Sequence, residues 1–195
     1  LACVDGSGLR DAVCDYAAWI AKRVDRPLKL LHTIDPHHET SDITDLTGNI
    51  GIASRDHLLE EITNTEFERS RQRMQEGKAI LQDASERVIN AGVAAPVSCL
   101  QHGGKIHENR PDQIGAKLEA MIRSLHRPIL VAYESFKTPQ QIMIAYDGSE
   151  TADKAVDIVA NSPLYKGLHC HLVCVNKKET AEQLLQKAAN VLKAS

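Results

Sequence analysis

The sequence repeats itself once, and this duplication constrains the fold more than any other feature of the chain. Residues 1–7 align with residues 143–149, so that Asp5 corresponds to Asp147 at an offset of 142 positions. The register continues without a gap through the segments that follow. Both copies read as an apolar strand ending in Asp-Gly-Ser, an amphipathic segment and a second apolar strand. Any two such units look alike in outline, but an unbroken register with the same tripeptide favours duplication. The sequence therefore predicts two copies of one α/β half joined head to tail.

The amphipathic segment that follows each Asp-Gly-Ser has the apolar spacing of one helical face. In the first copy that face carries Ala12, Val13, Tyr16, Ala17, Ile20, Ala21 and Val24, and in the second it carries Ala152, Ala155, Val156, Val159 and Ala160. Short apolar strands joined by helices are typical of a parallel sheet that is covered on both faces. We therefore expect an α/β fold of two tandem doubly wound parallel-sheet domains, over residues 1–136 and 137–195, with the second incomplete in this sequence.

The rest of the first copy shows further segments of distinct character. Residues 36–54 are polar and mixed, which predicts a long exposed loop, and a long helix is expected over about 55–91, ended by Gly92. A strand over 97–101, a helix over about 114–126 and a last strand over 128–132 should follow. In the second copy, a helix over about 180–193 is the last expected element.

Composition narrows the classes of partner. Apolar residues make up 43% and charged residues 25% of the chain, and the formal net charge is −3, which argues against a binder of nucleic acid or other polyanions. No apolar run approaches the roughly 20 residues that span a bilayer, so no membrane partner is expected. The five cysteines contain no CxxC pair that would indicate a zinc site or a disulfide framework, and we expect a reducing cytoplasm.

The Asp-Gly-Ser tripeptides stand where ligands bind in open parallel sheets, beyond the carboxyl ends of the strands. A carboxylate at the position of Asp5 can accept a ribose hydroxyl or hold a metal ion on a phosphate, and the N-terminus of the following helix favours anions. Gly6 permits a tight turn before Ser7. The alternative is a strand-to-helix turn with an N-cap and no ligand. Both interpretations stay open on these residues alone.

No standard catalytic or metal site is visible in the sequence. His169 and His171 share one strand face, and His37 and His38 lie in the polar loop, but neither pair has a third ligand at a recognised spacing. The chain contains no GxSxG, P-loop or HExxH motif. We therefore expect neither a catalytic residue nor a metal site formed by the protein itself.

Taken together, these motifs resemble the universal stress protein family, in its tandem form with two such domains in one polypeptide. The resemblance rests on residues 4–7, on residues 31–35 at the end of the second strand, on Gly115 and Ala116 before a helix, on residues 123–131 as a final helix and strand, and on residues 146–149, where the pattern restarts. It covers nearly the whole chain. The resemblance implies a five-stranded parallel sheet with strand order 3-2-1-4-5.

Many members of that family bind ATP, and the resemblance carries their site over to this chain position by position. It implies that Asp5 lies near the ribose and a metal ion, that Thr33 and Ile34 meet the adenine, and that Gly103 flanks the sugar. Gly115 and Ala116 would close the phosphate loop. The implied nucleotide-binding residues are Asp5, Gly6, Ser7, Thr33, Ile34, Gly103, Gly115 and Ala116 in the first copy and Asp147, Gly148, Ser149 and Val175 in the second. The implied cofactor is ATP, together with Mg²⁺.

The chain departs from the family's late motif, G-x2-G-x9-G-[S/T], at two points. Ala116 stands where that motif has serine or threonine, which removes a hydroxyl that could bond a phosphate. Only the twelve residues 102–113 separate the third strand from the last helix, too few for the family's third helix, fourth strand and first two glycines. Loss of an interior strand would leave two unpaired strand edges, so we expect residues to be absent near Glu108 and Asn109.

The leading interpretation is a cytoplasmic stress-response protein that binds a small ligand, ATP or another adenine nucleotide, and acts as a sensor or adaptor without turnover. Its halves are expected to pack as an intramolecular pseudo-dimer, and a homodimer is a further expected assembly. The alternative is a nucleotide-independent universal stress protein that works through protein contacts or another ligand, which Ala116 favours. A slow ATPase is the third interpretation, and the sequence offers no residue that would position its attacking water.

Overall fold

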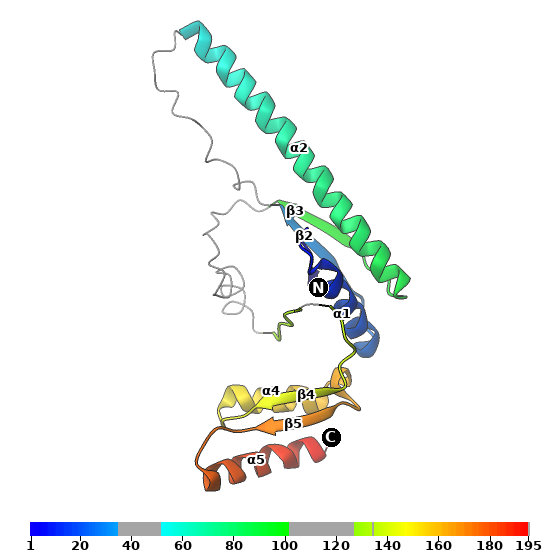
Figure 1. Cartoon of the computed structure of the whole chain (residues 1–195), viewed down its shortest axis with the longest axis vertical. Helices are drawn as coiled ribbons and strands as arrows, with labels where there is room; N and C mark the ends of the chain where they lie inside the picture. Colours follow the sequence, from blue (N-terminus) through cyan, green and yellow to red (C-terminus); the bar gives the residue numbers. More distant parts are fainter. Residues whose placement is uncertain (35–51, 102–126, 134, 195) are drawn as a thin grey trace. The chain divides into compact units, whose positions relative to one another are not determined.

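The computed structural model describes residues 1–34, 52–101, 127–133 and 135–194. They fall into two compact units: Leu1–Ala17 with Leu28–Phe136 form unit 1, and Ala18–Pro27 with Lys137–Ser195 form unit 2. The helix α1 (Arg10–Val24) contributes residues to both units. Figure 1 shows the elements along the chain.

Unit 1 contains a parallel sheet of three strands in the order β1-β2-β3. β1 (Ala2–Cys3) pairs with β2 (Leu30–Ile34), and β2 pairs along its whole length with β3 (Val97–Gln101). The sequence predicted parallel pairing from its short apolar strands joined by helices, and it also predicted the strand over 97–101; both are confirmed.

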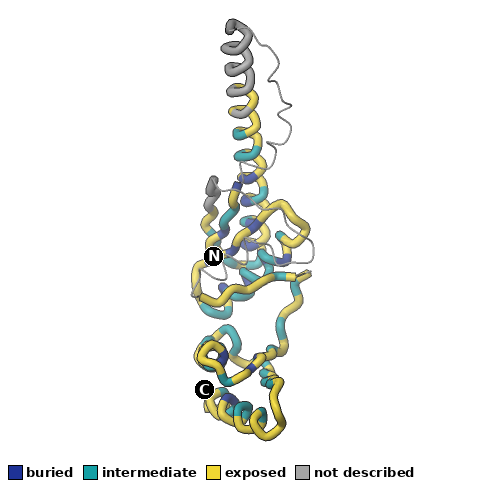
Figure 2. The backbone as a smooth tube through the Cα atoms, turned by 90° about the vertical axis from the view of Figure 1, so that its left-hand side faces the viewer, coloured by how far each residue is buried: buried dark blue, intermediate teal, exposed yellow. Residues whose placement is uncertain are grey.

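One long helix, α2 (Ile52–Asn90), packs on β2 and β3 (Figure 1). It ends before Gly92, whose φ is +79°, and the N–H of Gly92 donates to the carbonyl of Ile89 at 2.7 Å. The helix predicted over about 55–91 is therefore confirmed together with its stop. Among the residues whose burial is described, the buried ones of α2 lie in its C-terminal part (Figure 2). The core of unit 1 includes Ala2, Val4, Cys14, Leu30, Leu81, Ala84 and Val88.

The close approach of α2 to β2 explains a glycine in the middle of the helix. A Cβ atom at Gly77 would lie 2.9 Å from Cδ2 of His32 and 3.3 Å from Cδ1 of Ile34. The His32 ring is itself held by a hydrogen bond between its Nδ1 and the carbonyl of Val4, at 2.9 Å. Glycine costs about 1 kcal/mol relative to alanine in a helix interior, so tight packing outweighs helix propensity at this position.

Unit 2 contains two parallel strands, β4 (Gln141–Ala145) and β5 (His169–Val173). The helix α4 (Glu150–Asn161) and the short 3-10 helix η2 (Pro163–Tyr165) connect them, and α5 (Lys178–Lys193) follows β5, close to the helix predicted over 180–193. Alternate strand residues pack against both α-helices. The core consists of Ile144, Tyr146, Ala152, Val156 and Ala188, with Cys170, Leu172 and Leu184 partly buried against it.

The two strand pairs share one register at the spacing of the sequence repeat. Corresponding backbone pairs are Ala2 with Leu30 and Ile144 with Leu172 in the ladders, and, just beyond them, Val4 N–H with Leu31 O and Tyr146 N–H with Val173 O, both at 2.8 Å. Every residue of the second set stands 142 positions after its counterpart in the first. The correspondence between the two segments therefore extends from side-chain identity to backbone pairing.

The last strand predicted for the first copy is wrong. Residues 128–132 form no strand, and Leu130 and Val131 are exposed. A strand needs a neighbour to satisfy its backbone hydrogen bonds, and within the described ranges no strand lies beside this segment. The described sheet of unit 1 has three strands. The five-stranded order that the resemblance implies is therefore not tested by it.

Two further expectations have different outcomes. The loop predicted over 36–54 and the helix predicted over 114–126 lie outside the described residues, except that residues 52–54 already belong to α2. Coverage of the sheet on both faces does not hold for the described part of unit 1. Ala2 and Leu30 are buried on one face, whereas Cys3 and Thr33 on the opposite face are exposed.

Candidate functional site

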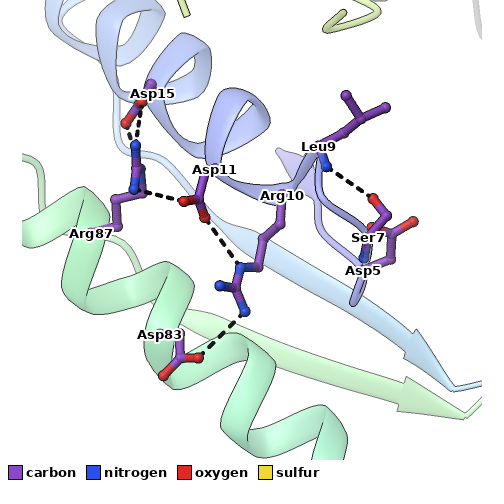
Figure 3. Close-up of polar contacts among 8 residues, drawn as sticks. All are labelled: Asp5, Ser7, Leu9, Arg10, Asp11, Asp15, Asp83 and Arg87. Atoms are coloured by element: carbon purple, nitrogen blue, oxygen red, sulfur yellow. Dashed lines mark hydrogen bonds and ion pairs between the residues drawn. The ribbon is translucent and has the colours of Figure 1, made fainter. Parts of the chain in front are cut away.

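The first Asp-Gly-Ser follows β1 at the carboxyl end of the sheet and leads into α1. Oδ1 of Asp5 accepts a hydrogen bond from the N–H of Ser7 at 3.0 Å, and Oγ of Ser7 accepts one from the N–H of Leu9 at 3.3 Å (Figure 3). Asp5 and Ser7 are both exposed. Within the described part of the chain, the Asp5 carboxylate accepts its hydrogen bond at Oδ1. Oδ2 of Asp5 is the oxygen that would meet a hydroxyl group or a cation of a ligand.

The second Asp-Gly-Ser follows β4 and leads into α4 with the same turn. Oδ1 of Asp147 accepts from the N–H of Ser149 at 2.9 Å, and Oγ of Ser149 accepts from the N–H of Ala152 at 3.2 Å, which makes Ser149 the N-cap of α4. Hydrogen bonds from the hydroxyl and the N–H of Ser149 lower the pKa of Asp147, because they favour its charged form. The loop thus presents an ionised carboxylate at neutral pH.

The two loops differ at their glycines. Gly148 has φ of +82°, in the left-handed region, and a Cβ atom there would lie 2.6 Å from Cδ2 of Leu184 in α5. The φ of Gly6 lies outside that region, and its Cβ would lie 3.5 Å from Cδ1 of Ile80 in α2, which is an ordinary contact. Each loop rests on the helix that follows the next strand. Only the second loop, however, needs glycine for its turn.

The residues implied to meet the adenine lie at the end of β2. Because β1 and β2 are parallel neighbours, this end lies at the same edge of the sheet as the Asp5 loop. Thr33 is exposed, whereas Ile34 is buried with its Cδ1 toward Gly77 of α2, so only the backbone of Ile34 remains for a ligand. Val175, implied for the second copy, lies beyond β5 and is 97% exposed.

The implied sugar and phosphate contacts are not part of the described structure. Gly103, Gly115 and Ala116 lie outside the described residues. The structure therefore places the carboxylate loops and the end of β2, and the assignment of the remaining contacts to these three residues stays a prediction.

Five charged side chains that the sequence analysis did not single out join α1 to α2 (Figure 3). Arg87 donates to both carboxylate oxygens of Asp15 at 2.8 Å each and to Asp11 at 2.9 Å. Arg10 contacts Asp83 and Asp11, both at 3.4 Å. The sequence signal was present, since Asp11 and Asp15 on one helix, and Asp83 and Arg87 on the other, stand four residues apart. These charges bind one another, so the cluster positions two helices rather than a ligand.

A second polar network ties the Asp147 loop to the helices of unit 2. Tyr146 is 2% exposed, and its hydroxyl donates to Oδ1 of Asp153 in α4 at 2.5 Å. Lys187 of α5 donates to Oδ2 of the same carboxylate at 2.8 Å. Asp153 stands 142 positions after Asp11. In both units the aspartate at this position forms an ion pair with a basic side chain of a later helix, Arg87 of α2 or Lys187 of α5.

The ion pair of this network leads to a prediction about the pKa of Asp153 and about stability at low pH. The hydrogen bonds from Lys187 and then from Tyr146 lower the pKa of Asp153. Lys187→Met should therefore raise that pKa toward its ordinary value, measured by a carbon-13 NMR titration of the side-chain carboxyl. Since the folded-state pKa lies below the unfolded value of about 3.9, the stabilisation is present above that pH and is lost as the pH falls through the folded value.

The matched control for this titration is Lys178→Met on the same helix, because Lys178 pairs with Glu182 instead. The control should leave the Asp153 midpoint where it is in the wild type. An unchanged midpoint in Lys187→Met would show that the ion pair does not set the pKa of Asp153.

Within the described ranges, no group of three or more His, Cys, Asp or Glu side chains is placed to hold a metal ion. The helices described here include none that is long and apolar enough to cross a membrane. These observations do not test the sequence-based expectations of no metal site and no catalytic residue.

Comparison with known proteins finds a relative whose sequence matches almost the whole chain. No family model matches. The chain is 27% identical over 220 residues to Universal stress protein Slr1230 from Synechocystis sp. (strain ATCC 27184 / PCC 6803 / Kazusa), and the match covers 96% of this chain and 77% of that protein. The match is longer than the 195 residues of this chain, so the relative has residues without a counterpart here.

Proposed function

We propose that this chain, a member of the universal stress protein family, is a stress-response protein that binds ATP or another adenine nucleotide at the carboxyl ends of its strands. It acts as a cytoplasmic sensor or adaptor through ligand-dependent binding, without turnover. Similarity over 96% of the chain to a universal stress protein supports the stress-response assignment. The geometry of the two Asp-Gly-Ser loops supports the proposal that an adenine nucleotide binds there.

The observation that carries the proposal is the carboxylate at each strand end. Asp5 and Asp147 both follow a parallel strand, both are exposed, and each is oriented by the N–H of the serine two residues later. Carboxylates so placed offer acceptor lone pairs for the two hydroxyl groups of a ribose. A turn that served only to cap the helix would not need a charged side chain at this position, because the serine supplies the capping oxygen at α4.

The surroundings fit the other parts of a nucleotide. The end of β2 offers backbone groups at the same edge of the sheet as Asp5, which suits the adenine ring. Mg²⁺ prefers oxygen ligands and keeps several waters, so one carboxylate with the phosphates of ATP would suffice to hold it. Asp5 and Asp147 are the residues that would do so. Bound there, the ion would neutralise the phosphate charge and fix the phosphate orientation.

The proposal extends to two tandem copies of the same half, paired as an intramolecular pseudo-dimer. The shared ladder register at an offset of 142 positions supports the duplication. It follows that each copy has its own carboxylate loop. The copies need not bind equally, because the left-handed Gly148 and the N-cap at Ser149 give the second loop a more constrained turn.

The test is calorimetric titration of Mg²⁺-ATP into the full chain, beside the variants Asp5→Asn and Asp147→Asn. Wild type should bind with micromolar affinity. The asparagine variant of a competent half should bind about ten-fold more weakly or worse, because a hydrogen bond to a charged group contributes about 1.5–3 kcal/mol. The variant that weakens binding identifies the half that holds the nucleotide.

Asp157→Asn is the matched control, since Asp157 is an exposed aspartate of α4 outside the loop. It should bind as the wild type does. If folded wild-type protein releases no heat of binding with Mg²⁺-ATP, ADP or AMP, the nucleotide assignment is wrong. The search for the ligand would then turn to protein partners and apolar molecules.

A further inference from the structure

Two histidines form a pair on the exposed face of β5, away from the Asp147 loop. His169 and His171 are two residues apart, so their side chains stand on the same face of the strand, and both are exposed. Their ring centroids are 4.6 Å apart with an interplanar angle of 76°. The pair is therefore already close enough for both imidazoles to reach one metal ion, which needs nitrogen ligands at about 2.0 Å.

A thioether stands beside the pair on the neighbouring strand. Met143 of β4 is the direct ladder partner of His171, and alternation along both strands places the two side chains on one face. Neighbouring strands in a sheet lie about 4.8 Å apart, so the side chains of ladder partners on one face are within reach of a shared ligand. Met143 is 70% exposed, so its thioether is accessible to an ion from solvent.

Gln141 orients one of the imidazoles. Its Oε1 lies 3.3 Å from Nε2 of His171, an arrangement in which the ring N–H donates to the amide carbonyl. The other ring nitrogen, Nδ1, then keeps its lone pair. Histidines that ligate metals commonly donate their second ring nitrogen to a carbonyl in this way, because the bond fixes the tautomer and the ring orientation.

From this arrangement we propose that His169, His171 and Met143 form a three-coordinate site for Cu(I). Zn²⁺ would require Cys, His, Asp or Glu as a third ligand, and the described residues place none of these with the pair. A thioether is a soft ligand that favours Cu(I). Two imidazoles and one thioether carry no net charge, so the site suits a monovalent ion that needs no carboxylate to balance it.

The test uses the full chain and Cu(I) supplied as its acetonitrile complex without oxygen, against the chelator bicinchoninate. Carbon-13 methyl labelling of the three methionines reports on the thioether itself, whereas competition with the chelator alone would also count Cu(I) bound by the five cysteines. The Met143 methyl and the ring signals of His169 and His171 should shift together and saturate. Met143→Leu should weaken Cu(I) binding at the histidines by about ten-fold or more, at least as much as loss of a residue that supports a metal ligand.

Met74→Leu is the matched control, because Met74 lies on α2 in unit 1, and it should leave the titration unchanged. A double variant, His169→Gln with His171→Gln, should abolish the shift of the Met143 methyl. Either of two results overturns the proposal: a Met143 methyl that does not move, or histidine signals that titrate with the same affinity in Met143→Leu. The second result would leave a histidine pair that binds without the thioether.

Discussion

Replacing Tyr146 with alanine is expected to lower the free energy of opening of unit 2 by about 3–5 kcal/mol, the range for removal of a large aromatic side chain from a core. Tyr146 is 2% exposed and packs in the cluster that includes Ile144, Val156 and Ala188. The loss should appear as faster native-state hydrogen exchange at the amides of β4 and β5, which report on unit 2 alone.

A second variant at the same position separates the ring from the hydroxyl. Tyr146→Phe keeps the packing and removes only the hydrogen bond to Asp153, so it should cost about 1 kcal/mol. Tyr133→Phe is the control, because Tyr133 is exposed, and it should change stability by less than about 0.5 kcal/mol. Equal losses in Tyr146→Ala and Tyr146→Phe would contradict the packing role of the ring.

Gly148→Ala is expected to lower the free energy of opening of unit 2 by about 2–5 kcal/mol, by the same exchange measurement. A left-handed conformation costs a residue with a Cβ about 1–2 kcal/mol, and crowding in a packed site adds about 1–3 kcal/mol. Both terms apply, since φ is +82° and the new Cβ would lie 2.6 Å from Leu184. The same change should also weaken ligand binding at Asp147, because it disturbs the turn that orients that carboxylate.

Gly6→Ala is the matched control in the first loop. Its φ lies outside the left-handed region, and its new Cβ would make an ordinary 3.5 Å contact with Ile80. A change of less than about 1 kcal/mol is therefore expected. If Gly6→Ala and Gly148→Ala cost the same, the difference between the two loops does not exist in solution.

Features that depend on neighbouring residues in the sequence were predictable. The apolar spacing of α1 and the stop of α2 at Gly92 follow from local rules, and both are confirmed. The strand over 97–101 followed from its apolar residues between turn signals. The segment over 128–132 is more apolar than 97–101 but has no strand beside it in the described structure. Strand pairing depends on two segments, and the sequence of one segment does not show it.

Some features of the candidate site were likewise predictable from the local sequence, and others were not. The positions of Asp5 and Asp147 at strand ends follow from their sequence context, because the tripeptide directly follows an apolar strand. The different conformations of Gly6 and Gly148 could not be predicted, since the tripeptides are identical and the difference lies in the local backbone and in the residue of the next helix beneath each loop. The contacts of Arg87 with Asp11 and Asp15 could not be predicted, because they depend on the packing of two helices. The contacting residues lie more than seventy positions apart in the sequence.

The most direct test of the central claim is an amide NMR titration of the full chain with Mg²⁺-ATP, with Mg²⁺-tripolyphosphate as the reference. The account predicts saturable shifts of the N–H signals of Ser7, Ser149 or both, because these amides bond the carboxylates that would hold the ribose and the ion. Tripolyphosphate, which lacks ribose and adenine, should reproduce them only in part or not at all. Folded protein in which neither serine amide responds to ATP would contradict the account.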